Sequence, residues 1–377
     1  MLDRRNGKPS PASGGGKGGG SAGEGLFANP AGTVILKAQH SAEAAIMASD
    51  RIHLSVAEAR ALGEGALRGI GYDAEEARII ADHVIDAALC GYEYSGLAKI
   101  LNIPEHRRFQ LPRRKMRILH ETEVSALYDG GNAVGMVAMY HAANATVAKA
   151  AAHGIAIIGV TNSWMSGRSA YFVEMIAKAD LVAIHTASSG SSVAPYGGTR
   201  PVLGTNPIAF ALPGDPSADG PLVLDMGTSA FMATELQLRA RLGQPLPDGV
   251  AIDRDGQPTR DANEAREGAL LPFGGHKGFG LGLIVQAFGI LGGAALVPGN
   301  DDGYVFIAFR PDLLVPLSEL RRELGALIAR VKAVPSQPGF AEIRIPGEQS
   351  ARNRRRLMAE GIGIDRLVYE RLGALAG

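Results

Sequence analysis

Four loops of the chain combine small polar residues with glycines, and loops of this kind suit an anion or a hydroxyl-rich ligand. They are the runs TASSGSSVAPYGG (186–198), LGTNP (203–207), LDMGTS (224–229) and PFGGHKG (272–278). The last run brings backbone N–H groups and Lys277 to the start of a predicted helix, which suits a phosphate. Each loop alone is also consistent with an ordinary turn. Together they indicate a ligand rich in phosphate and hydroxyl groups.

Several familiar catalytic motifs are missing from the chain. No GxGxxG run follows a predicted strand, no GxxxxGK[ST] run occurs, and GGHKGFGLG lacks the spacing of a Rossmann site. HExxH and GxSxG are absent, and the nine histidines show no metal-ligand spacing. The single cysteine, Cys90, excludes an internal disulfide and a cysteine-rich zinc centre. We therefore expect neither a metal site nor an α/β-hydrolase.

The composition is that of a globular protein without a charge bias. In 377 residues, 38 basic side chains balance 38 acidic ones, which argues against a nucleic-acid-binding surface. The run Phe279 to Val297 has 19 residues without a charge, which is long enough for a membrane span. Its five glycines and Gln286 favour instead a buried helix that packs closely through its glycines. We expect a cytoplasmic protein with no nucleic-acid partner and no membrane span.

Helices and short strands alternate along the chain. A helical hairpin is predicted between Ser55 and Lys99, with Ser55 and Asp73 as N-caps and a break at Gly69 and Gly71. After it, a strand, a glycine turn and an alanine-rich helix are expected within 124–153, strands at 154–160, 181–187, 207–213, 221–226, 304–309 and 340–345, and helices at 317–333 and from 348 onward. This alternation predicts an α/β or α+β fold.

The first 30 residues differ in kind from the rest. They contain SGGGKGGGSAGEG and few apolar side chains, so they cannot offset the entropy cost of becoming ordered. Arg4 and Arg5 precede no apolar run, and a secretion signal is therefore not predicted. We interpret this stretch as a disordered extension.

Eight runs of residues, in order along the chain, resemble one protein family. They are NSWMSG, VAPYGG, LGTNPIAFALP, PLVLDMGTS, AIDRDGQPT, LLPFGGHKGFGLGL, PGF and IPGE, and the resemblance covers residues 54–375. The chain is similar to the malate/lactate dehydrogenase family of non-Rossmann NAD(P)-dependent oxidoreductases, which includes ureidoglycolate and sulfolactate dehydrogenases and cyclic-imine carboxylate reductases. The resemblance implies a homodimer of mixed α+β fold that binds NAD or NADP in a cleft.

The resemblance also suggests a division into four parts. Residues 1–50 are expected to form the disordered glycine-rich extension, and residues 51–120 a helical N-terminal part that contributes to the active site. Residues 121–310 are expected to form the cofactor-binding α/β domain around a central mixed sheet. Residues 311–377 are expected to form a C-terminal α/β segment that packs back on the N-terminal part.

By the resemblance, the cofactor contacts fall on the runs DMGTS, HKG and PGE. The residues carried over from the family are Asp225, Met226, Gly227, Thr228, Ser229, Lys277, Gly278, Gly347 and Glu348. Lys277 is expected to meet the charge of a phosphate, and Thr228 and Ser229 to donate hydroxyl hydrogen bonds. For Asp225, a cap on its own loop is an equally open interpretation.

On the substrate side the sequence departs from the family pattern. The family's serine-histidine-glycine run appears as YSG at 94–96, so Ser95 stands where a histidine is expected. The arginine four residues later, which would hold a substrate carboxylate, is Lys99. A second expected histidine falls on Met165, and a lysine expected before VAPYGG falls on Ser191. The family's groups for proton transfer are therefore missing.

Residues near this altered site are candidates for catalysis, and we single out Tyr94, Ser95, Lys99 and Arg168. Tyr94 is expected to act as the acid, with Lys99 lowering the pKa of its phenol. Arg168 is expected to hold the substrate carboxylate, because a guanidinium binds a carboxylate through two hydrogen bonds. The alternatives are that Tyr94 packs in the core, that Lys99 lies on the solvated surface, and that Arg168 belongs to an ordinary ion pair.

The sequence therefore predicts an NAD(P)-dependent dehydrogenase or reductase. It would transfer a hydride to or from a small carboxylate with a keto, hydroxy or imine group. A protonated imine needs less help from a proton donor than a carbonyl does, which suits a site without the family's histidines. The alternative is a catalytically silent relative that binds the dinucleotide and acts as a binding or regulatory protein.

Overall fold

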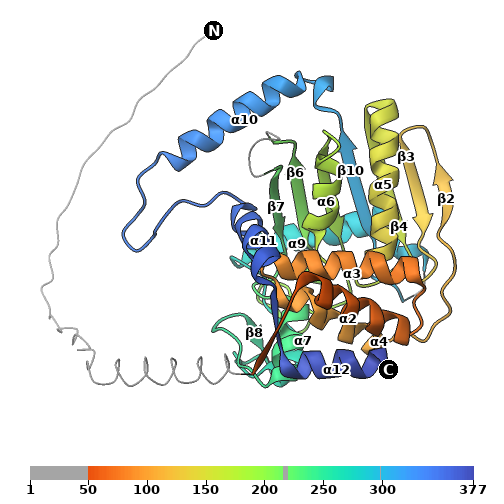
Figure 1. The fold of residues 1–377 in the computed structure, drawn as a ribbon, viewed down its shortest axis with the longest axis vertical. Coiled ribbons are helices and arrows are strands. Elements are labelled where there is room, and N and C mark those ends of the chain that lie inside the picture. The colour runs from red at the N-terminus through yellow and green to blue at the C-terminus, as the bar shows by residue number, and fades with distance from the viewer. Residues whose placement is uncertain (1–49, 215–219, 298) are drawn as a thin grey trace, which may run out of the picture. The chain divides into compact units, whose positions relative to one another are not determined.

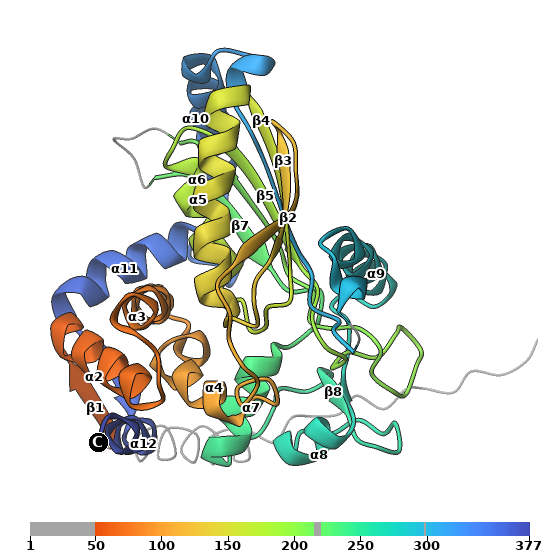
Figure 2. The same ribbon diagram turned by 90° about the vertical axis from the view of Figure 1, so that its right-hand side faces the viewer.

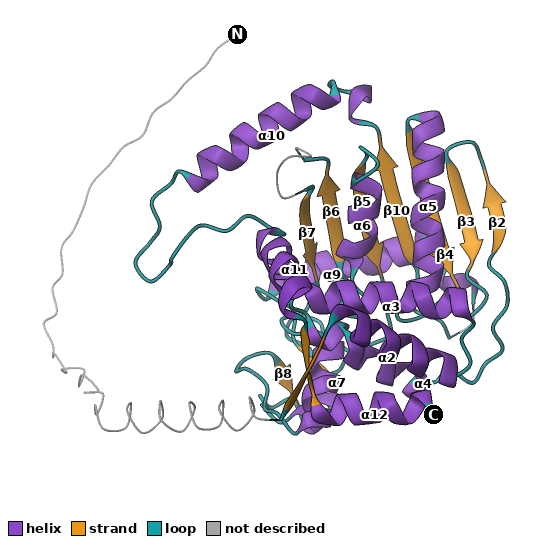
Figure 3. Ribbon diagram, viewed as in Figure 1, coloured by secondary structure: helices purple, strands orange, loops and turns teal. Residues whose placement is uncertain are grey.

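The computed structural model describes residues 50–214, 220–297 and 299–377, of which Arg51–Gly377 form one unit (Figure 1). The predicted disordered extension, residues 1–30, lies outside the described residues. Within the unit, a group of helices lies beside a seven-stranded mixed sheet (Figure 3). The mixed α/β class predicted from the alternation of helices and strands is therefore confirmed.

The helical part begins with the predicted hairpin, and its N-caps form as expected. The side chains of Ser55 and Asp73 accept hydrogen bonds from the N–H groups of Glu58 and Glu76, respectively. Glu58 also accepts from the N–H of Ser55 at 2.8 Å, which completes a capping box. The elements of this part are β1 (Arg51–Leu54), α2 (Val56–Gly69), α3 (Ala74–Leu89), the 3₁₀ turns Glu93–Ser95 and Leu97–Leu101, and α4 (Asn102–Glu105).

The central sheet has the strand order β2-β3-β4-β10-β5-β6-β7. β3 and β4 are parallel and joined by α5, whereas the other neighbouring pairs are antiparallel. α5 and α6 cover one face of the sheet and α9 lies on the other (Figure 2). The bounds are β2 (Arg117–Glu121), β3 (Ser125–Asp129), α5 (Gly135–His153), β4 (Ile155–Thr161), α6 (Ser169–Ala177), β5 (Val182–Ala187), β6 (Ile208–Leu212), β7 (Leu222–Met226), α9 (His276–Leu291) and β10 (Tyr304–Phe309).

The sequence predicts a buried helix at α9, but only one face of this helix is buried. Its glycines make the expected close contacts, since a Cβ on Gly289 would lie 2.0 Å from the Oγ of Ser188. The opposite face is open, and Ile290 and Leu291 keep 62% and 71% of their surfaces exposed. The reason is that the helix packs on one sheet, and no other described element covers its outer side. None of the described helices has both the length and the apolar character needed to cross a membrane.

A small lobe follows the central sheet and has a hydrophobic core of its own. Val193, Leu203 and Phe231 from the preceding loops pack there against Leu246 and Leu270. The lobe consists of α7 (Ala233–Leu242), α8 (Ala262–Glu267) and the paired short strands β8 (Ala251–Ile252) and β9 (Ala269–Leu270).

The C-terminal region differs from the prediction in two places. The run FAEIRI (340–345) alternates like a strand but forms none, because no neighbouring strand pairs with it and its Phe340 is 68% exposed. A strand occurs instead at β11, which pairs antiparallel with β1 and returns the chain to the helical part. The elements are α10 (Leu317–Lys332), α11 (Glu348–Glu360), β11 (Ile362–Asp365) and α12 (Arg366–Ala376), which packs on α2.

Two glycines of α9 give a matched test of its packing. We expect Gly289→Ala to lower the free energy of unfolding by about 2 kcal/mol, because the new methyl group would overlap the buried Ser188 side chain. Gly280→Ala, in the same helix, meets nothing within 4 Å and should raise the free energy of unfolding by about 0.5–1 kcal/mol. Urea unfolding measures both values, and equal effects at the two positions would contradict this packing.

Candidate active site

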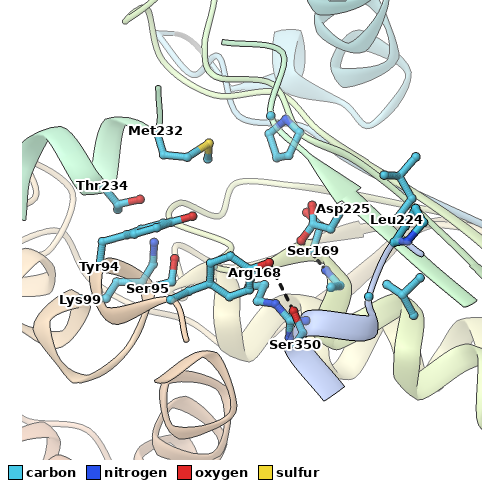
Figure 4. A pocket seen from close by; sticks show the side chains of 18 residues that line it. Tyr94, Ser95, Lys99, Arg168, Ser169, Leu224, Asp225, Met232, Thr234 and Ser350 are labelled. Carbon is cyan, nitrogen blue, oxygen red and sulfur yellow. Dashed lines mark hydrogen bonds between the residues drawn. The ribbon is translucent and has the colours of Figure 1, made fainter. Parts of the chain in front are cut away.

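Two adjoining cavities lie where the helical part meets the loops that follow β4, β5 and β7. The first, of about 200 Å³, is shown in Figure 4 and is lined by the 3₁₀ turns, the start of α6, the end of β7 and the start of α11. The second, of about 560 Å³, is lined largely by the loop after β5 and the loop before α6. Their common lining residues are Lys99, Gly167, Pro207, Met232 and Thr234.

The 3₁₀ turns after α3 bring Tyr94, Ser95 and Lys99 to the first cavity. The N–H of Ser95 donates to the carbonyl of Tyr92 at 3.0 Å, and that of Lys99 to the carbonyl of Gly96 at 2.9 Å. Gly96 permits the tight turn, because a Cβ there would lie 3.0 Å from the Cβ of Ala88. The structure thus brings three of the four predicted catalytic residues together on one short segment.

Lys99 is buried and has no counter-ion among the residues that the structure describes. It is 5% exposed, and within the described part of the chain its amine makes no hydrogen bond or ion pair. Burial lowers the pKa of Lys99 from 10.5 to about 8, because removal from water destabilises its charged form. Figure 4 shows the amine beside Tyr94 and Ser95 at the cavity. The alternative of a solvated surface lysine is therefore wrong, and an anion in the cavity would stabilise the charged amine.

Tyr94 lines the first cavity, and its hydroxyl points into it (Figure 4). The pKa of its phenol is raised well above its usual value by burial and then by the negative charges of Glu235 and Asp225. The expectation that Lys99 lowers this pKa is therefore wrong, because the loss of water outweighs any nearby positive charge. Tyr94 stays protonated, as a hydrogen-bond donor must. One side of its ring also packs against the helical core.

Arg168 lines the same cavity, but its guanidinium is held by two carboxylates of the protein. Nη1 donates to Asp86 at 2.8 Å and Nη2 to Glu174 at 3.4 Å. Arg354 of α11 binds the same two carboxylates, at 2.9 Å and 3.0 Å. The guanidinium also lies 5.5 Å from the ring centre of Tyr92. The geometry favours the ion-pair interpretation of Arg168 over a free carboxylate clamp.

The loop before α6 is fixed by a buried histidine that the sequence did not single out. The Nε2 of His83, on α3, accepts a hydrogen bond from the N–H of Arg168 at 2.8 Å. Gly167 must be glycine, because its φ is +87° and a Cβ would lie 2.2 Å from that nitrogen. Burial holds the pKa of His83 well below its usual value, so the ring is neutral and can accept. No sequence motif marks this contact.

The two positions where family residues are replaced both line the second cavity. Met165 lies in the loop before α6 with a φ of +59°, and Ser191 lies exposed in the loop after β5. Trp164, next to Met165, is buried, and its ring stacks on His106 with ring centres 4.3 Å apart. Neither Met165 nor Ser191 can exchange a proton near neutral pH. The cavity keeps its polar lining but lacks the expected imidazole and amine.

Asp302 is a second residue that the sequence interpretation missed. It lies just before β10 and lines the second cavity. Burial raises the pKa of its carboxyl to about 7, although Arg108 and Arg107 act in the opposite direction. It can therefore exchange a proton near neutral pH, unlike Met165 and Ser191 in the same lining. The two consecutive acids before a strand, Asp301 and Asp302, were the available signal.

Three of the predicted cofactor residues, Asp225, Gly227 and Gly347, line the first cavity. The carboxylate of Asp225 accepts a hydrogen bond from the N–H of Ala170, at the start of α6, at 2.7 Å. It therefore caps α6 rather than its own loop. Burial is the main reason that its pKa is raised. A ligand bound in this cavity would lie beside the half-buried carboxyl group of Asp225. This carboxyl group already caps the start of α6.

The hydroxyl groups after β7 are used inside the protein. Thr228 Oγ1 donates to the carbonyl of Thr205 at 3.2 Å, and Ser229 Oγ to that of Phe231 at 2.7 Å. Met226 ends β7 and lines neither cavity. Because the protons of both hydroxyls are already donated, these side chains can offer a cofactor only their lone pairs.

The start of α9 lies next to this loop. The N–H of Phe273 donates to the carbonyl of Thr228 at 3.2 Å, which joins the two runs. Lys277 lies exposed in the first turn of α9 and has no partner among the described residues. Gly278 must be glycine, since a Cβ would lie 2.1 Å from the carbonyl oxygen of Phe273. This helix N-terminus is therefore accessible and carries an unpaired amine.

Glu348 differs from Lys277 in that its charge is satisfied within the chain. Its carboxylate accepts from Lys332 at 2.6 Å and from the N–H of Ile345 at 3.0 Å, and it pairs with Arg352. These donors lower the pKa of Glu348 to about 2. The side chain therefore anchors the start of α11, and this contact positions Gly347 at the first cavity. Within the described residues, no cluster of histidine, cysteine or carboxylate side chains has the geometry of a metal site.

The comparisons with known proteins agree with this architecture. The malate/L-lactate dehydrogenase family matches residues 54–373. The chain is 31% identical over 339 residues to the malate/(S)-sulfolactate dehydrogenase of Methanothermus fervidus, over 86% of this chain and 97% of that one. It is 37% identical over 256 residues to the Δ1-pyrroline-2-carboxylate/Δ1-piperideine-2-carboxylate reductase of Pseudomonas putida, over 66% and 69% of the two chains. The malate dehydrogenase of Pyrococcus horikoshii superposes with a TM-score of 0.76 at 30% identity, over 87% and 95% of the two chains.

The fold, the site and these relatives define an oxidoreductase of the dehydrogenase and reductase class. The chain belongs to the malate/L-lactate dehydrogenase family. The resemblance inferred from the eight sequence runs is thereby confirmed, over nearly the range that those runs indicated.

The ion cluster predicts a structural effect for a residue first chosen as a substrate clamp. We expect Arg168→Met to lower the free energy of unfolding by about 3 kcal/mol, because Asp86 and Glu174 would then share Arg354, with only the exposed Lys178 beside Glu174. Urea unfolding at neutral pH measures the loss. Arg254→Met, at an exposed position, is the control and should change stability by less than about 0.5 kcal/mol. A stable Arg168→Met protein with only a raised KM would favour the clamp instead.

Proposed function

We propose that this enzyme transfers a hydride between NAD or NADP and a small carboxylate that bears a keto, hydroxy or imine group, at a site altered from the family pattern. The observation that carries the proposal is Lys99, a buried amine that has no counter-ion among the described residues and lines both cavities. The relatives named for malate, sulfolactate and cyclic-imine carboxylates support the substrate class, because each of these compounds is a small carboxylate.

The residues at the start of α9 fit a dinucleotide. The first turn of α9 carries the exposed amine of Lys277, which has no partner among the described residues, and a helix N-terminus attracts an anion. The loop after β7 joins this helix start to the first cavity, where Asp225 and Gly227 lie. We assign the cofactor's phosphates to Lys277 and Gly278 and its reactive end to the first cavity. The bound cofactor supplies or accepts the hydride.

Lys99 is assigned to the substrate carboxylate. A carboxylate restores the counter-charge that burial withholds from the amine, and the gain is large because little water competes at this position. An arginine is expected at this position in the family. Lys99 keeps the positive charge but cannot form the paired hydrogen bonds of a guanidinium group. Ser95, buried beside the amine, can donate a hydrogen bond to the same ligand.

We assign the role of proton donor to Tyr94. When a hydride adds to a carbonyl, negative charge develops on oxygen and a donor must stabilise it. The phenol of Tyr94 remains protonated, and its hydroxyl points into the cavity. Asp225 and Asp302 are the carboxyls with a raised pKa that line the two cavities, and they are the alternative donors.

A catalytically silent dinucleotide-binding protein is the second candidate. Met165 and Ser191 favour it, because neither side chain can transfer a proton where the family pattern expects a histidine and a lysine. The buried, unpaired Lys99 favours an enzyme, because a cavity without an anionic ligand gains nothing from such an amine.

We also propose that the enzyme is a homodimer. The outer face of α9 exposes Leu283, Ile284, Ile290 and Leu291, each at least half exposed. α10 and the segment that follows it stand away from the rest of the unit, and Leu324 is the buried residue of α10 (Figure 1). Apolar surface of this extent suits a second copy of the chain. Light scattering of the purified protein measures the oligomeric state.

Cofactor titration followed by a substrate screen tests the proposed activity. Fluorescence of NADH and NADPH should change on binding, and 2-oxo acids or cyclic imines with a carboxylate should then oxidise the bound cofactor. We expect Tyr94→Phe to lower kcat by about 10²–10³ with little change in KM, as a lost transition-state donor does. Cofactor binding without turnover of any compound in the screen would favour the silent protein. An unchanged kcat would move the donor role to Asp225 or Asp302.

The pKa of Lys99 gives a pH test of its role. The free amine is charged below about pH 8, so kcat/KM for a carboxylate should be constant there and fall about tenfold per pH unit above it. Lys99→Arg should remove this break, because a guanidinium stays charged. A wild-type profile without a break near pH 8 would contradict the assignment.

The charge of Lys99 is expected to lower the stability of the fold, although it favours substrate binding. The pKa of Lys99 is lower in the folded chain, about 8, than in the unfolded chain, 10.5. The buried charge therefore lowers the free energy of unfolding by its full amount below about pH 8. This loss of stability disappears as the pH rises toward 10.5. We expect Lys99→Met to raise the free energy of unfolding at pH 7 by about 3 kcal/mol while abolishing substrate binding.

A further inference from the structure

A third cavity, of about 510 Å³, lies where α4, α7, α8 and α12 come together. Four arginines line it, and they come from different elements: Arg107 after α4, Arg241 on α7, Arg266 on α8 and Arg371 on α12. Glu105 is the one carboxylate among the described lining residues. Four positive charges against one negative charge leave an excess of three at this cavity.

Arg241 is the buried member of this group. Its side chain is 6% exposed, and Nη2 donates to Asn102 at 2.8 Å and to Glu105 at 2.9 Å. Nη1 is buried as well, yet it has no hydrogen-bond partner among the described residues. A buried N–H group without an acceptor costs stability, and an oxygen in the cavity would provide that acceptor.

Arg266 and Arg371 are exposed and make no hydrogen bond or ion pair within the described part of the chain. They add positive charge at the rim, while the 59% exposed Glu105 offsets only part of it. Guanidinium groups bind phosphate and carboxylate oxygens through paired hydrogen bonds, and several of them around one cavity favour a ligand with more than one negative charge.

We propose that this cavity binds a multiply charged oxyanion of the phosphate or pyrophosphate type. The ligand would accept a hydrogen bond from Nη1 of Arg241 and pair with Arg266 and Arg371. The cavity shares His106, Arg107, Met165 and Gln237 with the second cavity of the candidate active site, so the ligand would lie next to the proposed substrate. The site does not depend on the redox function.

Calorimetric titration of the full chain with inorganic phosphate and inorganic pyrophosphate tests the site directly. We expect pyrophosphate to bind more tightly than phosphate, and both to bind more weakly as ionic strength rises. The double variant Arg266→Gln/Arg371→Gln removes groups without partners and should fold normally, while its affinity for pyrophosphate falls about tenfold or more. Arg254→Gln removes one exposed arginine outside the cavity and is the matched control, with unchanged affinity.

Two further measurements distinguish binding at this cavity from binding of phosphate at other sites. Lys277→Ala, and wild type saturated with NADPH, should keep the pyrophosphate binding that the double variant loses, because the proposed cofactor phosphate site is elsewhere. A substrate-borne phosphate would instead show as a raised KM in the double variant, for phosphorylated carboxylates alone. The proposal is wrong if wild type binds neither anion, if the double variant binds as wild type does, or if Lys277→Ala or NADPH abolishes binding.

Discussion

The salt bridges among Asp86, Arg168, Glu174 and Arg354 hold together the elements that surround the first cavity. Asp86 lies on α3, Arg168 just before α6, Glu174 within α6 and Arg354 on α11. Two positive and two negative charges therefore join the helical part, the sheet and the C-terminal region. The half-buried position makes each pair stronger than a surface ion pair, and loss of one member leaves the others without full compensation.

The cluster also bears on Lys99, which lines the first cavity with Arg168 and has no counter-ion among the described residues. Asp86 and Glu174 are already occupied by two arginines, so neither is free to neutralise the amine. His83, between Lys99 and Arg168, is neutral and accepts a backbone hydrogen bond rather than adding a charge. The fold thus keeps the amine of Lys99 available to an external ligand, at a cost in stability.

Sequence patterns predicted the helix ends correctly where the stabilising contacts join residues that are close together in the sequence. The caps at Ser55 and Asp73 and the breaks after Gly69 formed as predicted, because capping depends on residues three positions apart. The failures concern partners that lie far away in the sequence. The run at 340–345 has the alternation of a strand but no strand beside it, whereas β11 pairs with a strand at the other end of the chain.

The same distinction applies to the site. Sequence runs identified several of the residues that line the two cavities, because short loops that bind phosphate or hydroxyl groups have recognisable compositions. They gave no information on burial, so the position of Lys99 away from solvent and the raised pKa of Tyr94 could not be foreseen. They also gave no information on which charges are already paired. For that reason Arg168 and Glu348, both engaged in ion pairs, could not be told apart from the unpaired Lys277.

The pairing of β1 with β11 determines when the helical part can fold. Arg51 donates to the carbonyl of Gly363, 312 residues later, and Val368 and Leu372 of the last helix belong to the same hydrophobic core as Leu67 and Ile80. On a translating ribosome, α2 and α3 emerge long before these partners do. Contacts at such separation slow folding, and the incomplete core leaves apolar surface exposed in the meantime. Contacts from α12 and β11 thus complete a hydrophobic core whose helices α2 and α3 lie far before them in the sequence.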